Sequence, residues 1–227
     1  MSQFDFGAIG YGCMYLTSDE RSESDRLIRT ALDHGMRLID TADIYGYGTD
    51  AGFGAAEERL GEILSADPSL RDRMILATKG GITPPRPYDS SRDYLMSALE
   101  TSLQRLRVET IDLYQIHRPD LMIPMSDLAE TLQIMIDSGK VQAIGVSNFT
   151  AGQMRALSAH LKTPLRTIQP EFSVLNQSAL TDGVLDYSEE ISADVLAWSP
   201  LASGRIFTEN GPVQATLARI AADTGRT

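Results

Sequence analysis

The feature that most constrains this chain is a short apolar strand that ends abruptly in polar residues. In Arg37–Gly46 (RLIDTADIYG) the apolar run stops at Asp40. Strand interiors favour apolar, often β-branched residues, so the aspartate marks the end of the strand. The same pattern recurs where ILATKG reaches Lys79, LYQIHRPD reaches His117 and AIGVSNF reaches Ser147. The sequence therefore predicts a site assembled from the ends of several strands.

Strands and helices are predicted to alternate along the whole chain. Apolar runs bounded by turn residues indicate strands, and apolar residues at helical spacing indicate the helices between them. The predicted strands are Phe6–Tyr11, Arg37–Asp40, Met74–Thr78, Ile111–Ile116, Val141–Val146, Leu165–Gln169 and Asp194–Trp198. The predicted helices are Ser22–His34, Ala55–Leu64, Ser91–Leu106, Met125–Ser138, Ala151–Leu161, a short helix within Gln177–Ser188, and Val213–Thr224.

This alternation is typical of parallel α/β folds, of which two compete. A doubly wound nucleotide-binding fold carries G-x-G-x-x-G after its first strand, and Gly7, Gly10 and Gly12 lack that spacing. A (β/α)8 TIM barrel collects its chemistry at the C-terminal ends of many strands, which matches the observed pattern. We therefore expect one barrel domain over residues 1–227, lacking the eighth strand. We expect either that the natural chain continues past Thr227 or that a partner chain covers the gap.

Composition narrows the class of partner. The formal net charge of −11 argues against nucleic-acid or anionic-membrane partners, which require a basic face. No stretch has the roughly 20 apolar residues that span a bilayer, and the N-terminus does not resemble a signal peptide. Cys13 is the only cysteine, so no internal disulfide can form. It follows the first strand at the expected pocket rim, and nothing marks it as reactive. We expect a cytoplasmic protein.

Four polar side chains at consecutive strand ends suit proton donation. Unperturbed tyrosine has a pKa of about 10, too high for efficient donation near neutrality. An ammonium such as that of Lys79 favours the phenolate, so we expect it to lower the pKa of Tyr45. Asp40 would hold the lysine in place, and His117 would orient the oxygen that accepts the proton. This arrangement suits carbonyl reduction, for which a nicotinamide or flavin must supply hydride.

The later strand ends are rich in amides. Asn148 and Gln169 offer both donors and an acceptor, as binding a carboxamide requires. Trp198 offers a flat face on which a ring can stack. The segment Ser199–Arg205 (SPLASGR) offers backbone amides and a cation suited to a pyrophosphate. Together these features indicate a nicotinamide dinucleotide.

The motifs IDTADIYG, ATKGG, LYQIHRPD, GKVQAIGVSNF, IQPEFS and LAWSPLASGRIF, in this order, resemble the aldo-keto reductase superfamily. The residues HRPD and AWSPLASGRIF within these motifs are most similar to its bacterial YdhF-like oxidoreductase branch. The resemblance implies NADPH, with NADH as an alternative, and a small carbonyl substrate. It implies Tyr45 as general acid, supported by Asp40, Lys79 and His117. The cofactor-binding residues that it implies are Ser147, Asn148, Gln169, Trp198, Ser199, Leu201, Ser203, Gly204 and Arg205.

Two departures from the family accompany this resemblance. The N-terminus is too short for the whole of the β-hairpin that closes the bottom of the barrel in relatives. The eighth strand and the following basic motif, which grips the adenosine 2′-phosphate, have no counterpart before Thr227. The sequence leaves the substrate's identity and the oligomeric state open.

Taken singly, each candidate residue has an ordinary explanation. Asp40 could be a turn or capping residue, and Tyr45 and His117 could be packed structural side chains. Only their conjunction at successive strand ends favours catalysis. A metal site on His117 and Asp120 lacks further histidines at ligand spacing, so we predict none. The alternative functions are a non-catalytic cofactor-sensing or regulatory protein on the same fold, or an inactive barrel fragment.

Overall fold

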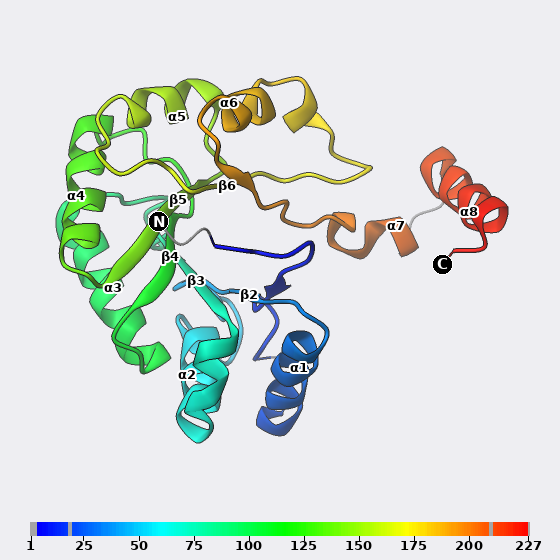
Figure 1. Ribbon diagram of the computed structural model, residues 1–227, viewed down its shortest axis with the longest axis horizontal. Coiled ribbons are helices and arrows are strands. Elements are labelled where there is room, and N and C mark those ends of the chain that lie inside the picture. Colours follow the sequence, from blue (N-terminus) through cyan, green and yellow to red (C-terminus); the bar gives the residue numbers. More distant parts are fainter. Residues whose placement is uncertain (1–3, 18–19, 209–210, 227) are drawn as a thin grey trace.

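A computed structural model of the chain describes residues 4–17, 20–208 and 211–226. Within these residues the centre is a parallel sheet whose seven strands pair in chain order, from β1 to β7. Figure 1 shows the sheet curling so that its strands fan around an interior, with the helices in an arc outside. The strands are β1 (Tyr11–Gly12), β2 (Leu38–Asp40), β3 (Ile75–Gly80), β4 (Ile111–Ile116), β5 (Val141–Ser147), β6 (Thr167–Gln169) and β7 (Asp194–Val195).

Helices connect the strands, as parallel pairing requires. Most of them start and stop within a few residues of the predicted positions. The α-helices are α1 (Arg21–Asp33), α2 (Ala55–Ala66), α3 (Arg92–Leu106), α4 (Met125–Asp137), α5 (Ala151–Ser158), α6 (Val184–Glu190), α7 (Arg205–Thr208) and α8 (Pro212–Thr224). The short 3-10 helices are η1 (Pro68–Arg73), η2 (Ser178–Leu180) and η3 (Ala202–Gly204).

The prediction of seven strands and an α/β fold is confirmed, while closure by an eighth strand stays a prediction. Most strands differ from their predicted ranges by one or two residues at an end, and the first and last strands differ most. The first strand is Tyr11–Gly12 rather than Phe6–Tyr11, because Gly7 takes a positive φ of 70° and breaks the extended run. Phe6 instead packs against the inward residues Leu38 and Ala77 at the base of the sheet. The last strand is Asp194–Val195 rather than Asp194–Trp198, although Trp198 forms a single bridge with Glu171.

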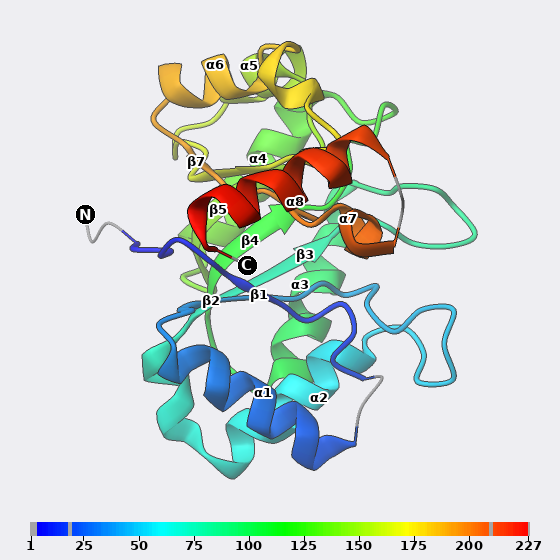
Figure 2. The same cartoon turned by 90° about the vertical axis from the view of Figure 1, so that its right-hand side faces the viewer.

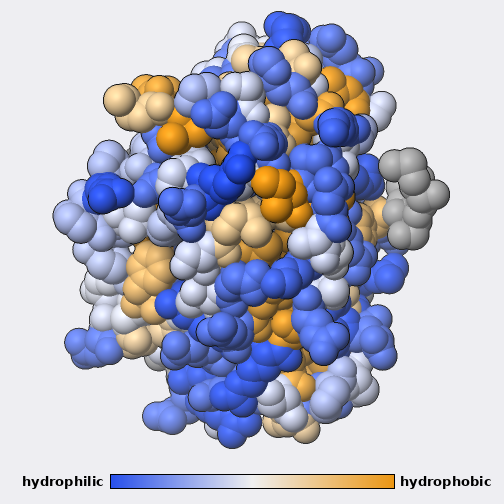
Figure 3. All heavy atoms as spheres, turned by 90° about the vertical axis from the view of Figure 1, so that its left-hand side faces the viewer, coloured by the Kyte–Doolittle hydropathy of each residue, from blue (hydrophilic) through white to orange (hydrophobic). Residues whose placement is uncertain are grey.

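Strand periodicity divides the side chains into two faces. Residues that point outward, such as Ile39, Leu76 and Ile144, pack with the helices into the main hydrophobic core. Figure 3 shows the outer face of the molecule covered mainly by hydrophilic residues, with hydrophobic ones in the furrows between. The helices are therefore amphipathic, with their apolar faces on the sheet.

Residues that point inward change from apolar to polar along β2, β3 and β4. The lower layer holds Leu38, Ala77 and Leu113, which contact one another within a separate apolar cluster. Two residues further along, the register brings Lys79 beside Gln115. The apolar base thus supports a polar layer at the C-terminal ends of the strands.

The open side of the sheet lies between β1 and β7. Figures 1 and 2 show α8 lying across this side, apart from the arc of the other helices. None of the described residues of α8 is buried. Across the described residues, no helix is long and apolar enough to cross a membrane.

Candidate active site

Lys79 occupies the centre of the polar layer, and its side chain is only 1% exposed. Its Nζ donates to Asp40 Oδ2 at 2.6 Å, to the carbonyl oxygen of Thr41 at 2.9 Å and to the Tyr45 hydroxyl at 3.3 Å. Burial alone would lower the pKa of this ammonium. Asp40 and Tyr45 together raise the pKa by more than burial lowers it, so the net shift is upward. Lys79 therefore remains a cation at physiological pH, and each of its three N–H groups donates to one of these oxygens.

Asp40 has two further donors besides the lysine. Gln169 Nε2 donates to its Oδ2 at 3.2 Å, and Gln115 Nε2 approaches its Oδ1 at 3.4 Å. Thr167 Oγ1 donates to Gln115 Oε1 at 3.1 Å, which orients the amide so that its nitrogen faces Asp40. A buried carboxylate needs such donors to compensate for lost solvation. These contacts hold Asp40, and through it Lys79, in one geometry.

Gly145 makes room for this network. A Cβ at Gly145 would lie 2.0 Å from Thr167 Oγ1 and 3.2 Å from Gln115 Cγ. Gly145 stands between these residues in the sheet, paired with Gln115 on one side and Thr167 on the other. The absence of a side chain therefore lets the threonine reach the glutamine across the intervening strand.

Tyr45 and His117 lie edge to face, with ring centroids 5.9 Å apart and an interplanar angle of 80°. Burial, with the nearby cations of Lys79 and Arg118, lowers the pKa of His117 to about 2, so the imidazole is neutral. Its Nδ1 is buried and has no hydrogen-bond partner among the described residues. A neutral imidazole has one N–H donor and one acceptor, and both suit a polar group bound beside Tyr45.

The expected lowering of the Tyr45 pKa is wrong for this structure. Burial raises the pKa of the hydroxyl, and the opposing effect of Lys79 does not offset it. The sequence places the lysine at the right strand end but gives no measure of desolvation, which favours the neutral phenol. Tyr45 is therefore protonated at neutral pH and oriented by its contact with the lysine.

The amide-rich residues predicted for the cofactor form one hydrogen-bonded chain. Ser147 Oγ donates to the carbonyl oxygen of Gln169 at 2.8 Å. Asn148 Nδ2 donates to Ser147 Oγ at 2.8 Å and to the carbonyl oxygen of His117 at 3.1 Å. Trp198 Nε1 donates to Asn148 Oδ1 at 3.0 Å, which fixes both the amide and the indole. The chain of contacts joins this cluster directly to the site around Lys79.

The remaining predicted cofactor residues lie together on the segment that contains η3 and the start of α7. The hydroxyls of Ser199 and Ser203 are 3.0 Å apart. Ser199, Ser203 and Gly204 have positive φ angles of 49°, 54° and 84°. Leu201 and Arg205 belong to the same segment and are exposed. The structure thus gathers Ser199, Leu201, Ser203, Gly204 and Arg205 on one exposed turn, and their roles stay predictions.

Three contributors to the site were not predicted: Gln115, Thr167 and Arg118. Gln115 and Thr167 are fully buried, and the alternation of inward positions in their strands could have indicated them. Arg118 lies with its guanidinium carbon 5.9 Å from the Trp198 ring centroid. It follows His117 directly, so its charge reaches both halves of the site.

Cys13 is fully buried rather than at the rim, and burial, with the charge of Asp40, raises the pKa of its thiol. A thiol in this state is a poor nucleophile. Within the described ranges, no cluster of three or more histidine, cysteine or acidic residues could hold a metal ion.

Residues 8–218 match the sequence pattern of the aldo/keto reductase family. The chain belongs to this family. The family's 6-dehydroglucose reductase from Novosphingobium aromaticivorans is 50% identical over 200 residues, covering 87% of this chain and 66% of that protein. Oxidoreductase YdhF from Escherichia coli is 37% identical over 204 residues, covering 86% of this chain and 66% of YdhF. The resemblance to the family and its YdhF-like members is confirmed, and the chain spans about two thirds of the length of these two relatives.

Solved structures of the aldo/keto reductase family show the same fold. The thermostable aldo-keto reductase Tm1743, crystallised with the inhibitor epalrestat, superimposes with a TM-score of 0.85 at 26% identity. The match covers 100% of this chain and 79% of Tm1743. The glycerol dehydrogenase of Gluconobacter oxydans gives a TM-score of 0.78 at 32% identity, over 93% of this chain and 65% of that enzyme.

Proposed function

We propose that this aldo/keto reductase reduces an aldehyde or ketone to an alcohol, using NAD(P)H as the hydride source. The observation that carries the proposal is the single buried ammonium of Lys79, bonded at once to Asp40 and to the Tyr45 hydroxyl. Relatives named as reductases support it, among them the L-glyceraldehyde 3-phosphate reductase of Escherichia coli, 35% identical over 190 residues. The substrate would be a small carbonyl compound.

The residues present fit a nicotinamide cofactor. Ser147, Asn148 and Gln169 offer hydroxyl and amide groups that match the hydrogen-bonding capacity of a carboxamide. Trp198, half-buried and oriented by Asn148, offers an aromatic face beside them. The turn from Ser199 to Arg205 would hold the pyrophosphate. When bound, the cofactor supplies the hydride that no side chain can provide.

Tyr45 would donate the proton to the carbonyl oxygen of the substrate. Because its hydroxyl remains protonated at neutral pH, the proton is available when the oxygen gains charge. The Lys79 ammonium would stabilise the tyrosinate left behind, and Asp40 would hold the ammonium in place. Neutral His117 would donate a hydrogen bond to the same carbonyl oxygen and so orient the substrate.

We further propose that the seven strands form part of a closed eight-stranded barrel, in one domain and in the cytoplasm. An open parallel sheet leaves two unpaired edges, here β1 and β7, which closure would satisfy. NADPH is the expected cofactor and NADH the alternative.

Fluorescence titration with NADPH, followed by turnover of small aldehydes and ketones, tests this function. We expect saturable binding and carbonyl-dependent oxidation of the nucleotide. Binding without turnover of any carbonyl compound would instead indicate a sensing or regulatory protein. An absence of binding would contradict the proposed cofactor site.

A further inference from the structure

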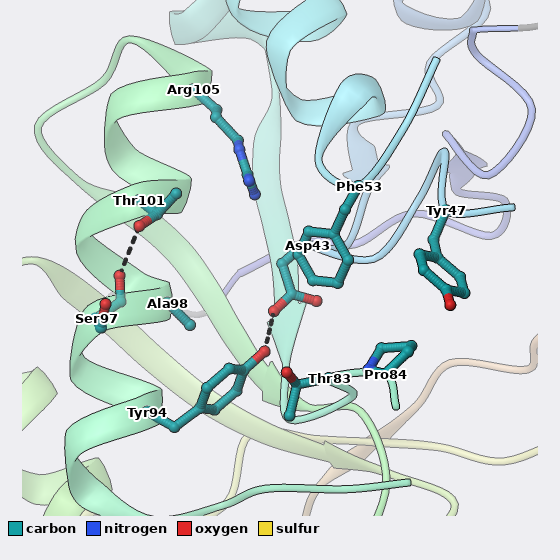
Figure 4. A pocket seen from close by; sticks show the side chains of 10 residues that line it. All are labelled: Asp43, Tyr47, Phe53, Thr83, Pro84, Tyr94, Ser97, Ala98, Thr101 and Arg105. Atoms are coloured by element: carbon teal, nitrogen blue, oxygen red, sulfur yellow. Dashed lines mark hydrogen bonds between the residues drawn. The ribbon is translucent and has the colours of Figure 1, made fainter. Parts of the chain in front are cut away.

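A cavity lies outside the curled sheet, on the side of α3. It encloses about 410 Å³ between α3 and the loops that follow β2 and β3. Asp43, Tyr47, Phe53, Tyr94 and Arg105 are among the residues that line it (Figure 4). None of the residues assigned above to catalysis or cofactor binding lines this cavity. It is therefore separate from the candidate active site.

Asp43 is the polar group at the bottom of this cavity. Its side chain lies on the outward face of the sheet, beside Gly80 and Tyr114, whereas Asp40 points inward. The residue is 2% exposed, and its backbone N–H donates to the carbonyl oxygen of Lys79 at 3.0 Å, which fixes its position. The Tyr94 hydroxyl donates to Oδ2 at 3.0 Å.

The other carboxylate oxygen of Asp43, Oδ1, is buried and makes no hydrogen bond of normal geometry with the residues that the structure describes. The nearby backbone N–H of Ile44 lowers the pKa of the carboxyl, but it does not complete such a bond to Oδ1. Figure 4 shows this oxygen turned away from Tyr94, toward the space beside Phe53, Thr83 and Pro84. A buried acceptor without a donor is destabilising, so a ligand that donates there gains the full interaction.

The walls above Asp43 are largely aromatic. Tyr47 and Phe53 meet edge to face, with ring centroids 6.5 Å apart at 76°. The Tyr94 ring lies on the side of α3, with its hydroxyl on Asp43. An apolar ring or hydrocarbon body fits between such faces, with a single donor directed at the carboxylate.

The charges around the cavity favour a cation. Arg105 lies over the Phe53 ring at 5.5 Å, but its guanidinium is paired with Glu57 at 3.4 Å and Glu58 at 3.9 Å. Arg105 is therefore neutralised by carboxylates that do not line the cavity, which leaves Asp43 as the acid that a ligand meets among the lining residues. Burial raises the pKa of Asp43 to about 7, and a bound cation favours its ionised form, so a cationic ligand gains more than a neutral one.

We propose that this cavity binds a small organic ammonium ion with an aromatic or alicyclic body. Its N–H donates to Asp43 Oδ1, and its ring packs against Tyr47, Phe53 and Pro84. The aromatic faces add cation–π attraction to the ammonium. The site is independent of the proposed reductase reaction, since it uses none of that reaction's residues.

Titration with benzylammonium, and with benzyl alcohol as the neutral isostere, tests the proposal. Binding is measured by calorimetry and by amide chemical-shift mapping on the chain. Benzylammonium should bind at least about 10-fold more tightly than benzyl alcohol, because its hydrogen bond to Asp43 is charge-assisted. The shifts should centre on Tyr47, Phe53 and Ala98.

Two variants test whether benzylammonium binds in this cavity and not elsewhere on the protein. Asp43→Asn keeps an acceptor for Tyr94 but removes the charge, and should weaken benzylammonium at least about 10-fold. Ala98→Phe adds a ring to the cavity wall on α3 and should abolish binding while leaving Asp43 intact. Equal affinity for the neutral alcohol, unchanged affinity in Asp43→Asn, shifts confined to the surroundings of Asp40, or no binding of either probe would each overturn the proposal.

Discussion

Asp40 and Asp43 lie three residues apart in one motif and have opposite environments. Asp40 is held by the Lys79 ammonium and the amides of Gln115 and Gln169. Asp43 accepts a side-chain hydrogen bond from the Tyr94 phenol, and its second oxygen makes no hydrogen bond of normal geometry with the described residues. Burial, with the charge of Glu57, raises the pKa of Asp43 to about 7. Burial alone therefore does not fix the protonation state of a carboxyl group. The donors and charges that surround the group decide whether it is ionised and what it can bind.

Lys79→Met should have the largest effect on stability. The Asp40 side chain is 14% exposed, so the variant leaves a largely buried carboxylate without its cation, and breaking a buried pair typically costs about 3 to 5 kcal/mol. The free energy of unfolding, measured by urea denaturation, should fall by about that amount. Carbonyl reduction should be lost as well, since Tyr45 would lose the charge that stabilises its deprotonated form.

Lys140→Met is the matched control for Lys79→Met. Lys140 pairs with Glu100 at the surface, where the side chains are 40% and 45% exposed. Exposed pairs contribute about 0 to 1 kcal/mol, so this variant should be nearly neutral. Similar losses in the two variants would contradict the central role of the Lys79–Asp40 pair.

Gly145→Ala should have an intermediate effect. The new methyl group would collide with Thr167 Oγ1 and push it from Gln115, at a cost of about 1 to 3 kcal/mol for overpacking. Gly12→Ala is the control, because a Cβ at Gly12 meets nothing within 4 Å. Thermal or chemical denaturation compares the two, and equal stabilities would show that the Thr167–Gln115 contact does not hold Asp40.

Asp43→Asn should have the smallest effect, visible as a change with pH. Between the ordinary pKa of 3.8 and the raised value of about 7, the folded state holds a proton that the unfolded chain releases. The wild type should therefore lose about 1 kcal/mol from pH 5 to pH 6 relative to the variant, which does not titrate. The groups that face Asp43 are Glu57 on α2, Tyr94 and Arg105 on α3, and Tyr114 on β4.

Denaturation at the two pH values, with the exposed Asp50→Asn as control, measures this difference. Parallel stabilities of wild type and Asp43→Asn would show that Asp43 is ionised in the folded protein. In that event the contrast between the two aspartates would rest on geometry alone.

Much of this candidate site could be predicted from the sequence because the ends of strands can be recognised from the hydrophobic pattern. An apolar run that stops at a polar residue located Asp40, Lys79 and His117, and parallel topology then brought them together. The order of the elements followed from the same pattern. The first strand was misplaced because Phe6 is as apolar as a strand residue, although it packs against the base of the sheet.

The sequence did not predict every hydrogen-bond partner or the pKa shifts of the site residues. The alternation of inward positions could have indicated Gln115 in β4, but not that its amide faces Asp40, because that contact crosses from β4 to β2. The pKa of Tyr45 depends on two opposing effects, the burial of the hydroxyl and its distance from the Lys79 ammonium. A sequence motif specifies neither of them. The partnerless oxygen of Asp43 likewise depends on the side chains of α2 and α3 around it.

The central claim is that Tyr45, held by Lys79 and Asp40, donates the proton in carbonyl reduction. Single-turnover reduction of a small aldehyde by NADPH, compared between the wild type and Tyr45→Phe, tests it most directly. We predict a loss of at least about 100-fold in rate, the usual contribution of a general acid, with NADPH affinity unchanged. A Tyr45→Phe variant that turns over at the wild-type rate would contradict the account.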